Sequence, residues 1–229
     1  RDSSTSRGLG DVYKRQDYEI QFGNVKRPTH KNTSWDRARF EVCAHKWADL
    51  SEPGYGVALM NDCKYGYDVH EGVMGLTLIK SGIFPNPDAD QGQHEFTYAL
   101  FPHQGDFRKG SVVREAYDLN CPMAWEKVQG IYEDSFSMLQ IAEENVMADT
   151  VKAAEDGNGI IVRIYETWGM RTKVHVNFPL APDAQVTVCD CMENFSGVEN
   201  ADMTRAQDGW SFTMKPYEIK TLRIVNEKK

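Results

Sequence analysis

Short segments in which apolar and polar residues alternate with a period of two run through most of the chain. Tyr18, Ile20 and Phe22 would share one face of a strand, because successive side chains of a β-strand point to opposite faces. Clusters of Gly, Pro, Asn and Asp separate the segments and are typical of turns. Further segments with strand character are residues 40–44, 55–62, 73–81, 94–101, 135–142, 159–168, 172–178, 184–191 and 217–225.

This pattern predicts an all-β fold, an antiparallel β-sandwich, because no helical segments of the βαβ type separate the strands. One short helix is expected from Ser111 to about Leu119. Ser111 would cap it, and Val112, Val113 and Ala116 would join Leu119 in an apolar stripe.

The strand pattern is absent from the first residues and is interrupted once. Residues 1–16 are rich in Ser, Arg and Gly and have no period, so we expect a disordered and non-native leader. The stretch 110–134 breaks the rhythm of strands. We therefore expect a large β-sandwich at residues 17–134 and a smaller C-terminal β-sandwich at residues 135–229.

The charge balance and the cysteines limit the classes of partner and the cellular compartment that we expect for this protein. The 229 residues carry a net charge of -8, which argues against nucleic acid and anionic membrane surfaces as partners. No apolar run reaches the roughly 20 residues that cross a bilayer. The cysteines are odd in number and widely spaced, which favours free thiols and predicts a cytoplasmic protein. They are Cys43, Cys63, Cys121, Cys189 and Cys191.

The spacing of acidic residues and histidines identifies no catalytic group. Hydrolysis of a glycoside needs two carboxyl groups that flank the bond, but the 34 acidic residues show no distinctive pair. A zinc site needs three or four ligands that converge, and the six histidines lie singly along the chain. No residue is therefore predicted to be catalytic or to bind a metal ion.

The segment 61–68 is the best candidate for a binding site. Asn61, Asp62, Lys64 and Tyr65 combine an amide, a carboxylate, an ammonium group and an aromatic ring beside Gly66. Planar polar groups bind sugar hydroxyls, and an aromatic face covers the apolar side of a sugar ring. In the alternative interpretation, this is a polar turn whose Asn and Asp bond to their own backbone.

Several long segments resemble the cytosolic branch of the family 38 α-mannosidases. The most specific is RPTHKNTSWDRARFEVCAHKWADLSEPGYGVALMNDCKYGYDV at residues 27–69. The resemblance extends to DYEIQFG at 17–23, QHEFTYALFPHQGDF at 93–107, VKAAEDGNGIIVRIYETWG at 151–169 and PYEIKTLRI at 216–224. It therefore covers nearly everything after residue 16.

The resemblance implies a retaining glycosidase that acts on α-linked mannose in oligosaccharides. Its zinc ion and aspartate nucleophile would lie in an N-terminal catalytic domain, which these residues do not resemble and which would be the partner of this chain. By analogy with the family, Asp90 and His94 would contact an outer sugar. The alternative for the acidic loop 86–92 is an ordinary solvent-exposed connection. Self-association into a homo-oligomer stays open.

Three hypotheses follow. The first is a β-sandwich that supports and partly walls the active site of an α-mannosidase and is inactive alone. The second is a free-standing carbohydrate-binding module that uses the 61–68 segment. The third is a structural sandwich without sugar contact.

Overall fold

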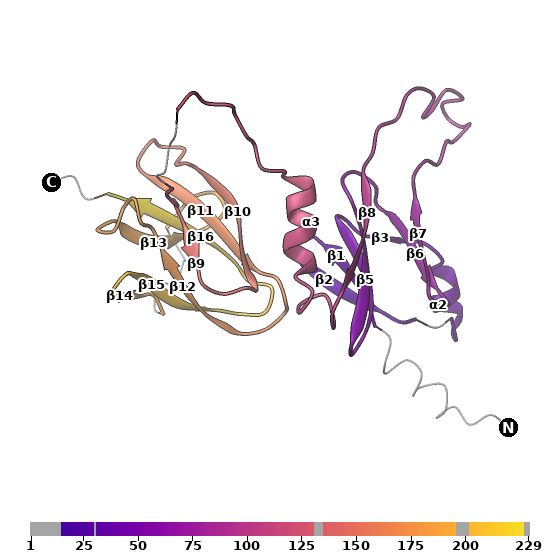
Figure 1. Ribbon diagram of the computed structural model, residues 1–229, viewed down its shortest axis with the longest axis horizontal. Coiled ribbons are helices and arrows are strands. Elements are labelled where there is room, and N and C mark those ends of the chain that lie inside the picture. Colours follow the sequence, from indigo (N-terminus) through magenta and orange to yellow (C-terminus); the bar gives the residue numbers. More distant parts are fainter. Residues whose placement is uncertain (1–14, 30, 131–134, 196–201, 227–229) are drawn as a thin grey trace. The chain divides into compact units, whose positions relative to one another are not determined.

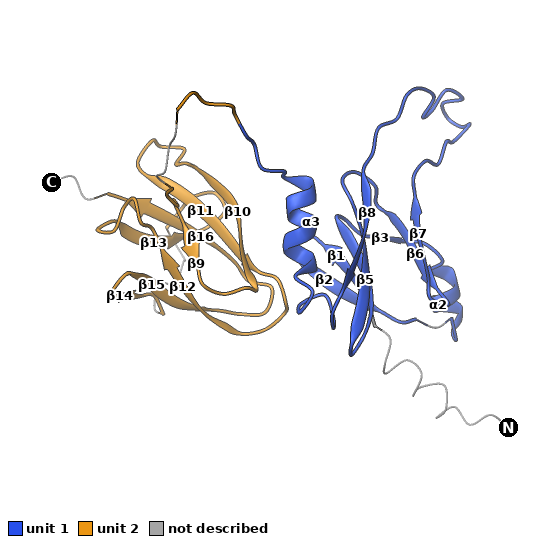
Figure 2. Ribbon diagram, in the orientation of Figure 1, with its two compact units in different colours: residues 1–125 blue, residues 126–229 orange. Residues whose placement is uncertain are grey.

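The described residues of the computed structural model, 15–29, 31–130, 135–195 and 202–226, form antiparallel β-sheets with two helices (Figure 1). The fold class predicted from the alternating segments is confirmed. Residues 1–125 form one compact unit, unit 1, and residues 126–229 form a second, unit 2 (Figure 2). The sequence had placed this division after residue 134.

The elements of unit 1 are β1 (Arg15–Ile20), β2 (Gly23–Arg27), α2 (Ser34–Ala38), β3 (Val42–Cys43), β4 (Trp47–Glu52), β5 (Tyr55–Asn61), β6 (Gly66–His70), β7 (Val73–Thr77), β8 (Tyr98–His103) and α3 (Val112–Asn120). The elements of unit 2 are β9 (Gln140–Ile141), β10 (Val146–Ala153), β11 (Ile160–Glu166), β12 (Thr172–Asn177), β13 (Gln185–Cys189), β14 (Thr204–Ala206), β15 (Gly209–Met214) and β16 (Ile219–Val225).

Strand β1 begins inside the segment for which disorder was predicted. Most of the expected leader, residues 1–14, lies outside the described residues, but Arg15 and Gln16 pair with Ser51 and Leu50 of β4. The Gln16 side chain is buried, donates to the carbonyl of Val69 at 3.2 Å, and accepts a hydrogen bond from a tyrosine hydroxyl. The expectation for these two residues was wrong because neither the backbone pairing of both nor the buried polar side chain of Gln16 leaves an apolar pattern in the sequence.

Unit 1 is built on a five-stranded sheet in the order β2-β1-β4-β5-β8. One face packs against the three-stranded sheet β3-β6-β7, and the core residues between them include Tyr18, Ala48, Leu59 and Tyr67. Helix α3 contacts β4 and β5. The apolar core of the sandwich in unit 1 thus lies between these two sheets.

Helix α3 lies close to its predicted position, but its start differs from the prediction. Val112, Val113 and Ala116 are buried, as the apolar stripe requires. Ser111 has a φ of 55° and its side chain makes no capping hydrogen bond. The left-handed backbone at Ser111 directs the chain from the 104–111 segment into the helix, so the hydroxyl group does not reach the first turn.

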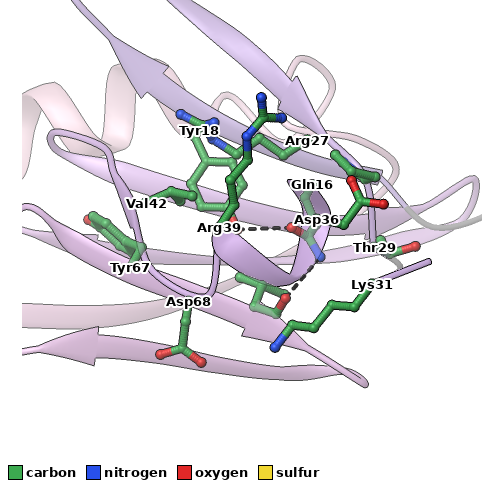
Figure 3. A pocket seen from close by; sticks show the side chains of 12 residues that line it. Gln16, Tyr18, Arg27, Thr29, Lys31, Asp36, Arg39, Val42, Tyr67 and Asp68 are labelled. Atoms are coloured by element: carbon green, nitrogen blue, oxygen red, sulfur yellow. Dashed lines mark hydrogen bonds between the residues drawn. The ribbon is translucent and has the colours of Figure 1, made fainter. Parts of the chain in front are cut away.

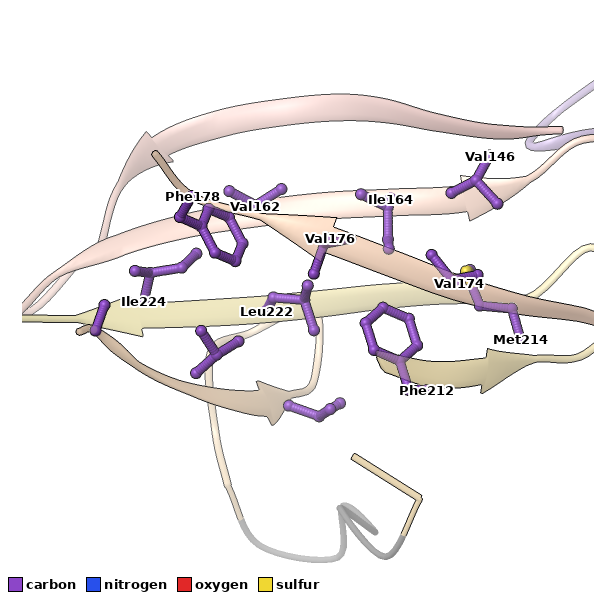
Figure 4. Packing of buried hydrophobic residues seen from close by; sticks show 13 residues of the cluster. Val146, Val162, Ile164, Val174, Val176, Phe178, Phe212, Met214, Leu222 and Ile224 are labelled. Carbon is purple, nitrogen blue, oxygen red and sulfur yellow. The ribbon is translucent and has the colours of Figure 1, made fainter. Parts of the chain in front are cut away.

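Unit 2 is a sandwich of two four-stranded sheets, β10-β11-β16-β13 and β14-β15-β12-β9. Alternate residues of the facing strands fill the space between them (Figure 4), as the period of two requires. Its buried cluster is Val146, Val162, Ile164, Val174, Val176, Phe178, Ala184, Val186, Val188, Phe212, Met214, Leu222 and Ile224.

A buried carboxylate fixes the turn at one end of unit 2. Glu166 is fully buried at the end of β11. Its two oxygens accept hydrogen bonds from the side-chain amide of Asn145 and from four backbone N–H groups, at 2.8 to 3.1 Å. The backbone donors are Trp168, Gly169, Met170 and Tyr217. One side chain thus satisfies donors from β11's turn and from the segment that precedes β16.

We expect Glu166→Gln to destabilise unit 2 by about 3 kcal/mol, because the neutral amide places N–H donors against N–H donors that then stay buried and unsatisfied. Urea denaturation followed by circular dichroism measures the effect. The control is Asp183→Asn at an exposed position of unit 2, which should change the unfolding free energy by less than about 0.5 kcal/mol. Equal effects of both substitutions would contradict this role of Glu166.

Candidate functional site

The polar turn between β5 and β6, residues 62–65, lines a shallow hollow on unit 1. The hollow has a cavity volume of about 240 Å³, which is below the roughly 300 to 1,000 Å³ of sites that enclose a drug-sized ligand. It therefore suits contact with part of a larger ligand. Its lining residues are His45, Lys46, Asn61, Asp62, Cys63, Lys64, Tyr65 and Asn120. Four predicted site residues thus lie together.

Asn61 holds the turn in place and is not available to a ligand. It is buried at the end of β5. Its amide nitrogen donates to the carbonyl of His45 at 3.2 Å and to the Tyr67 hydroxyl, and its oxygen accepts from the N–H groups of Cys63, at 3.0 Å, and Lys64. Both polar atoms of the amide are therefore occupied by the fold, as the structural interpretation of this segment proposed.

Asp62 ties the turn to the segment that enters β8. Its two carboxylate oxygens each lie 3.0 Å from the backbone nitrogen of Thr97, and its own N–H donates to the Thr97 carbonyl at 3.2 Å. Hydrogen bonds from the Cys63 side chain and from Thr97 hold the pKa of Asp62 below its ordinary value. The carboxylate is exposed and negatively charged at neutral pH.

Lys64 and Tyr65 present the side chains that the turn leaves accessible. The Lys64 ammonium group lies 4.9 Å from the centre of the Phe96 ring, a cation–π distance. Tyr65 is 58% exposed and meets the ring of His45 edge to face at 5.7 Å. An ammonium group and an exposed aromatic face therefore stand side by side in sequence at the rim of the hollow.

Asp90 and His94 do not line this hollow. Both are exposed in the long connection between β7 and β8, which extends beyond the ends of these strands (Figure 1). A ring nitrogen of His94 lies 2.7 Å from the backbone oxygen of Asp90. The same connection reaches the polar turn through the residues that follow His94, where the Cys63 thiol lies 4.0 Å from the carbonyl oxygen of Glu95 and where Phe96 and Thr97 contact Lys64 and Asp62. The described contacts thus group Asp90 with His94, and separately group the four residues of the turn.

A second hollow lies between β1, β2, α2 and β6 (Figure 3). The guanidinium group of Arg27 lies 5.5 Å from the centre of the Tyr18 ring, and Asp36 bonds to Thr33 in a capping box. The cavity volume is about 30 Å³, which is room for one or two water molecules. This size favours a hydrated gap over a ligand site.

Sequence reasoning missed a buried polar cluster on the face of the large sheet that is opposite to the sandwich core. Asp17 and Asp49 stand directly opposite each other in the β1–β4 ladder, and both are fully buried. Nε2 of His103 lies 2.7 Å from Oδ1 of Asp49. The remaining oxygen of Asp49 and both oxygens of Asp17 have no hydrogen-bond partner among the described residues. No spacing rule signals such a cluster, because it depends on strand register.

Burial sets the protonation of this cluster. The loss of hydration raises the pKa of Asp17 to about 6, and the nearby charge of Asp49 adds to the rise, while Lys26 and Arg108 oppose it. Burial likewise raises the pKa of Asp49, and its hydrogen bond to His103 opposes the rise. A side chain added at Gly56 or Gly110 would overlap the His103 ring. The cluster is therefore closed to a substrate.

The described residues hold no group of three or more His, Cys, Asp or Glu side chains placed to bind a metal ion. The same part of the chain contains no helix that is long and apolar enough to span a bilayer. All five cysteines are free thiols, and Cys189 alone among them is buried.

Two protein-family models match the chain, one in each unit. "Glycosyl hydrolases family 38 C-terminal domain" matches residues 13–88, and "Glycosyl hydrolases family 38 C-terminal beta sandwich domain" matches residues 145–222. The fold resembles the crystal structure of an alpha-mannosidase from Enterococcus faecalis V583 with a TM-score of 0.71 and 20% identity, over 91% of this chain and 24% of that chain.

Curated relatives share about two-fifths of the residues. Alpha-mannosidase G of Dictyostelium discoideum is 40% identical over 225 residues, which are 93% of this chain and 20% of that protein. Alpha-mannosidase 2C1 of Homo sapiens is 40% identical over 212 residues, 91% of this chain and 20% of that protein. Alpha-mannosidase of Saccharomyces cerevisiae is 39% identical over 90% of this chain and 21% of its own length. The chain thus spans about a fifth of these relatives.

The buried carboxyl of Asp17 makes the stability of unit 1 depend on pH. The unfolded chain releases this proton near pH 4, whereas the folded chain keeps it to about pH 6. The folded state binds more protons in this window, so its stability falls as the pH rises from about 4 to about 6. The full shift corresponds to about 3 kcal/mol.

Asp17→Asn should remove this loss, so that the variant gains stability relative to the unmodified chain as the pH rises through the window. Urea denaturation at pH 4 and at pH 6.5 measures the difference. Asp88→Asn, a substitution in an exposed loop, is the control and should leave the difference near zero. Parallel pH profiles for the unmodified chain and Asp17→Asn would contradict the assignment.

Proposed function

Because this chain belongs to the C-terminal region of glycosyl hydrolase family 38, we propose that it is the β-sandwich portion of an α-mannosidase that hydrolyses α-linked mannose in oligosaccharides. The observation that carries this proposal is the 40% identity over 225 residues with a protein named as an α-mannosidase. That similarity extends through both units, and so links the whole described fold to one class of enzyme.

The chemistry of this enzyme belongs to the other part of a family 38 polypeptide. We propose that a catalytic domain in the same polypeptide holds the zinc ion and the aspartate nucleophile of a retaining reaction. The residues described here do not fit a zinc site, since no three ligand side chains converge among them. Asp17 and Asp49 are adjacent carboxyl groups, but both are buried beneath the sheet surface, where no glycosidic bond can reach them.

The contribution of unit 1 is then to wall the substrate cleft with the polar turn. Lys64 would donate hydrogen bonds to sugar hydroxyls, and the exposed ring of Tyr65 would cover an apolar sugar face. Asn61 and Asp62 position them, because their bonds to the turn and to Thr97 fix the backbone. Asp90 and His94 would meet a more distant sugar through the long connection.

Charge and thiol chemistry support the remaining parts of the proposal. The net charge of -8 disfavours nucleic acid and anionic membrane surfaces as partners. The free thiols are typical of a reducing compartment, so we place the enzyme in the cytoplasm. The specific partner that remains is a mannose-containing oligosaccharide, held between this chain and the catalytic domain.

A carbohydrate-binding module is the second candidate, and the 58% exposure of Tyr65 favours it. Such a module would bind mannose without the rest of an enzyme. The two candidates differ in one measurable property, the affinity of the isolated chain for sugar.

The isolated chain should not hydrolyse a chromogenic α-mannoside, with or without added zinc or cobalt, because its described residues offer no accessible catalytic pair. A chimera in which this chain replaces the matched fifth of the Dictyostelium relative should hydrolyse it in a metal-dependent manner. Turnover by the isolated chain would contradict the proposal that the catalytic groups lie in another domain. A folded chimera without turnover would contradict the proposal that this chain is the β-sandwich portion of an α-mannosidase.

Tyr65→Ala in the chimera should lower kcat/KM for an oligomannoside about tenfold, which corresponds to about 1.4 kcal/mol, because the sugar loses an aromatic face. Phe40→Ala removes another exposed ring of unit 1 outside the hollow and should leave kcat/KM unchanged. Calorimetry on the isolated chain should show no heat with millimolar mannose. A binding isotherm that Tyr65→Ala abolishes would instead establish the carbohydrate-binding module.

A further inference from the structure

Strand β8 is apolar on both faces, although it lies at the edge of its sheet. Its sequence is YALFPH, and among the described residues it pairs with β5 alone. A strand with apolar residues on both faces is typical of a position buried on both faces. Water-exposed edge strands commonly carry charged side chains that discourage further pairing, and β8 carries no Lys, Arg, Asp or Glu.

One row of side chains across the large sheet shows which face of β8 lacks a cover. The ladder register aligns Tyr18, Ala48, Leu59 and Leu100 on neighbouring strands. Their exposed fractions are 2%, 0%, 6% and 67%. Three members of the row form the core against the second sheet, whereas Leu100 on β8 is open to solvent.

The cover ends because the second sheet is narrower than the first. The sheet β3-β6-β7 has three strands and the large sheet has five. Met74 of β7 lines an apolar groove together with Val57 of β5 and Leu100 of β8. Edge strands β7 and β8 therefore border the same groove, whose cavity volume is about 440 Å³.

Exposed apolar side chains continue around the groove. Tyr98 precedes Leu100 by two positions and so shares its face of β8, and Tyr55 lies on β5. Each of these side chains is more than half exposed. We call the β8 edge together with Tyr55, Val57, Met74, Tyr98 and Leu100 the open side of unit 1.

We propose that a β-strand from the remaining part of the family 38 polypeptide pairs with the free edge of β8 and covers Tyr98 and Leu100. The proposal rests on the function proposed above. The chain spans a fifth of the length of its curated relatives, so an enzyme of this kind has ample polypeptide to supply the strand. Backbone pairing at the edge and an apolar face beside it are the two elements of recognition by strand addition.

The geometry specifies the added strand. Its residues that face the groove are apolar and alternate with polar ones, because only one face meets Tyr98 and Leu100. Pro102 near the end of β8 has no N–H group, so pairing is concentrated at residues 98–101. The strand completes the row Tyr18, Ala48, Leu59 and Leu100 with a fifth side chain and extends the sandwich core.

Hydrogen exchange tests the proposal directly. The same chimera with the Dictyostelium relative is compared with the isolated chain. Backbone amides of residues 98–101 that do not bond to β5 should exchange at least about a hundredfold more slowly in the chimera, because pairing removes them from water. The double variant Tyr98→Lys with Leu100→Lys should lose that protection in the chimera. Both side chains are exposed in the isolated chain, so it should keep its thermal unfolding midpoint.

A matched control is the pair Val151→Lys with Met192→Lys, two exposed apolar positions of unit 2, which should leave the protection of β8 intact. Equal exchange of β8 in the isolated chain and in the chimera would overturn the proposal. Protection already present in the isolated chain, together with a dimer on size-exclusion chromatography that the double variant dissociates, would also overturn it and assign the open side to a second copy.

Turnover is recorded separately on the same chimera. Protection of β8 without hydrolysis of an α-mannoside would retain the added strand and reject the proposed function. Hydrolysis with an unprotected β8 edge would retain the proposed function and reject the added strand.

Discussion

The burial of Tyr67 is the interaction on which both the core and the polar turn of unit 1 depend. Its ring is fully buried between the two sheets and meets Tyr18 edge to face at 6.4 Å. Its hydroxyl donates to the carbonyl of His45 at 3.0 Å and accepts a hydrogen bond from Asn61. The apolar core therefore positions the backbone from which Lys64 and Tyr65 project. A change that moved the sheets would move the proposed sugar contacts as well.

The two units differ in how completely their apolar faces are covered and their buried carboxyl groups are hydrogen-bonded. Unit 2 encloses its apolar cluster between two sheets of equal width, and the buried Glu166 has five donors around it. Unit 1 leaves the open side uncovered and buries Asp17 with no hydrogen-bond partner among the described residues. Buried carboxyl groups without partners are costly. This contrast agrees with a C-terminal sandwich that stands by itself and a larger sandwich that shares its core with other polypeptide.

The sequence predicted the location of the polar turn, but it did not predict the role of each residue in that turn or the buried acidic cluster. Polar groups gathered at residues 61–65 predicted a turn with binding character, and the lined hollow contains all four chosen side chains. Their separate roles did not follow, because Asn61 acts through His45 and Tyr67, which are distant in sequence or on another strand. The acidic cluster escaped prediction entirely. Asp17 and Asp49 are 32 positions apart, and strand register alone makes them neighbours.

The sequence by itself determined the all-β class, the approximate position of helix α3 and the family, since alternation, apolar spacing and long specific motifs are local properties of a chain. Tertiary structure alone decided where strands with many polar residues lie: β4, WADLSE, is central to its sheet and its Asp49 is buried. It also decided that Leu100 is exposed while Leu59, its cross-strand partner, is not. The physical reason is that burial depends on what covers a face, and that cover comes from residues far away along the polypeptide.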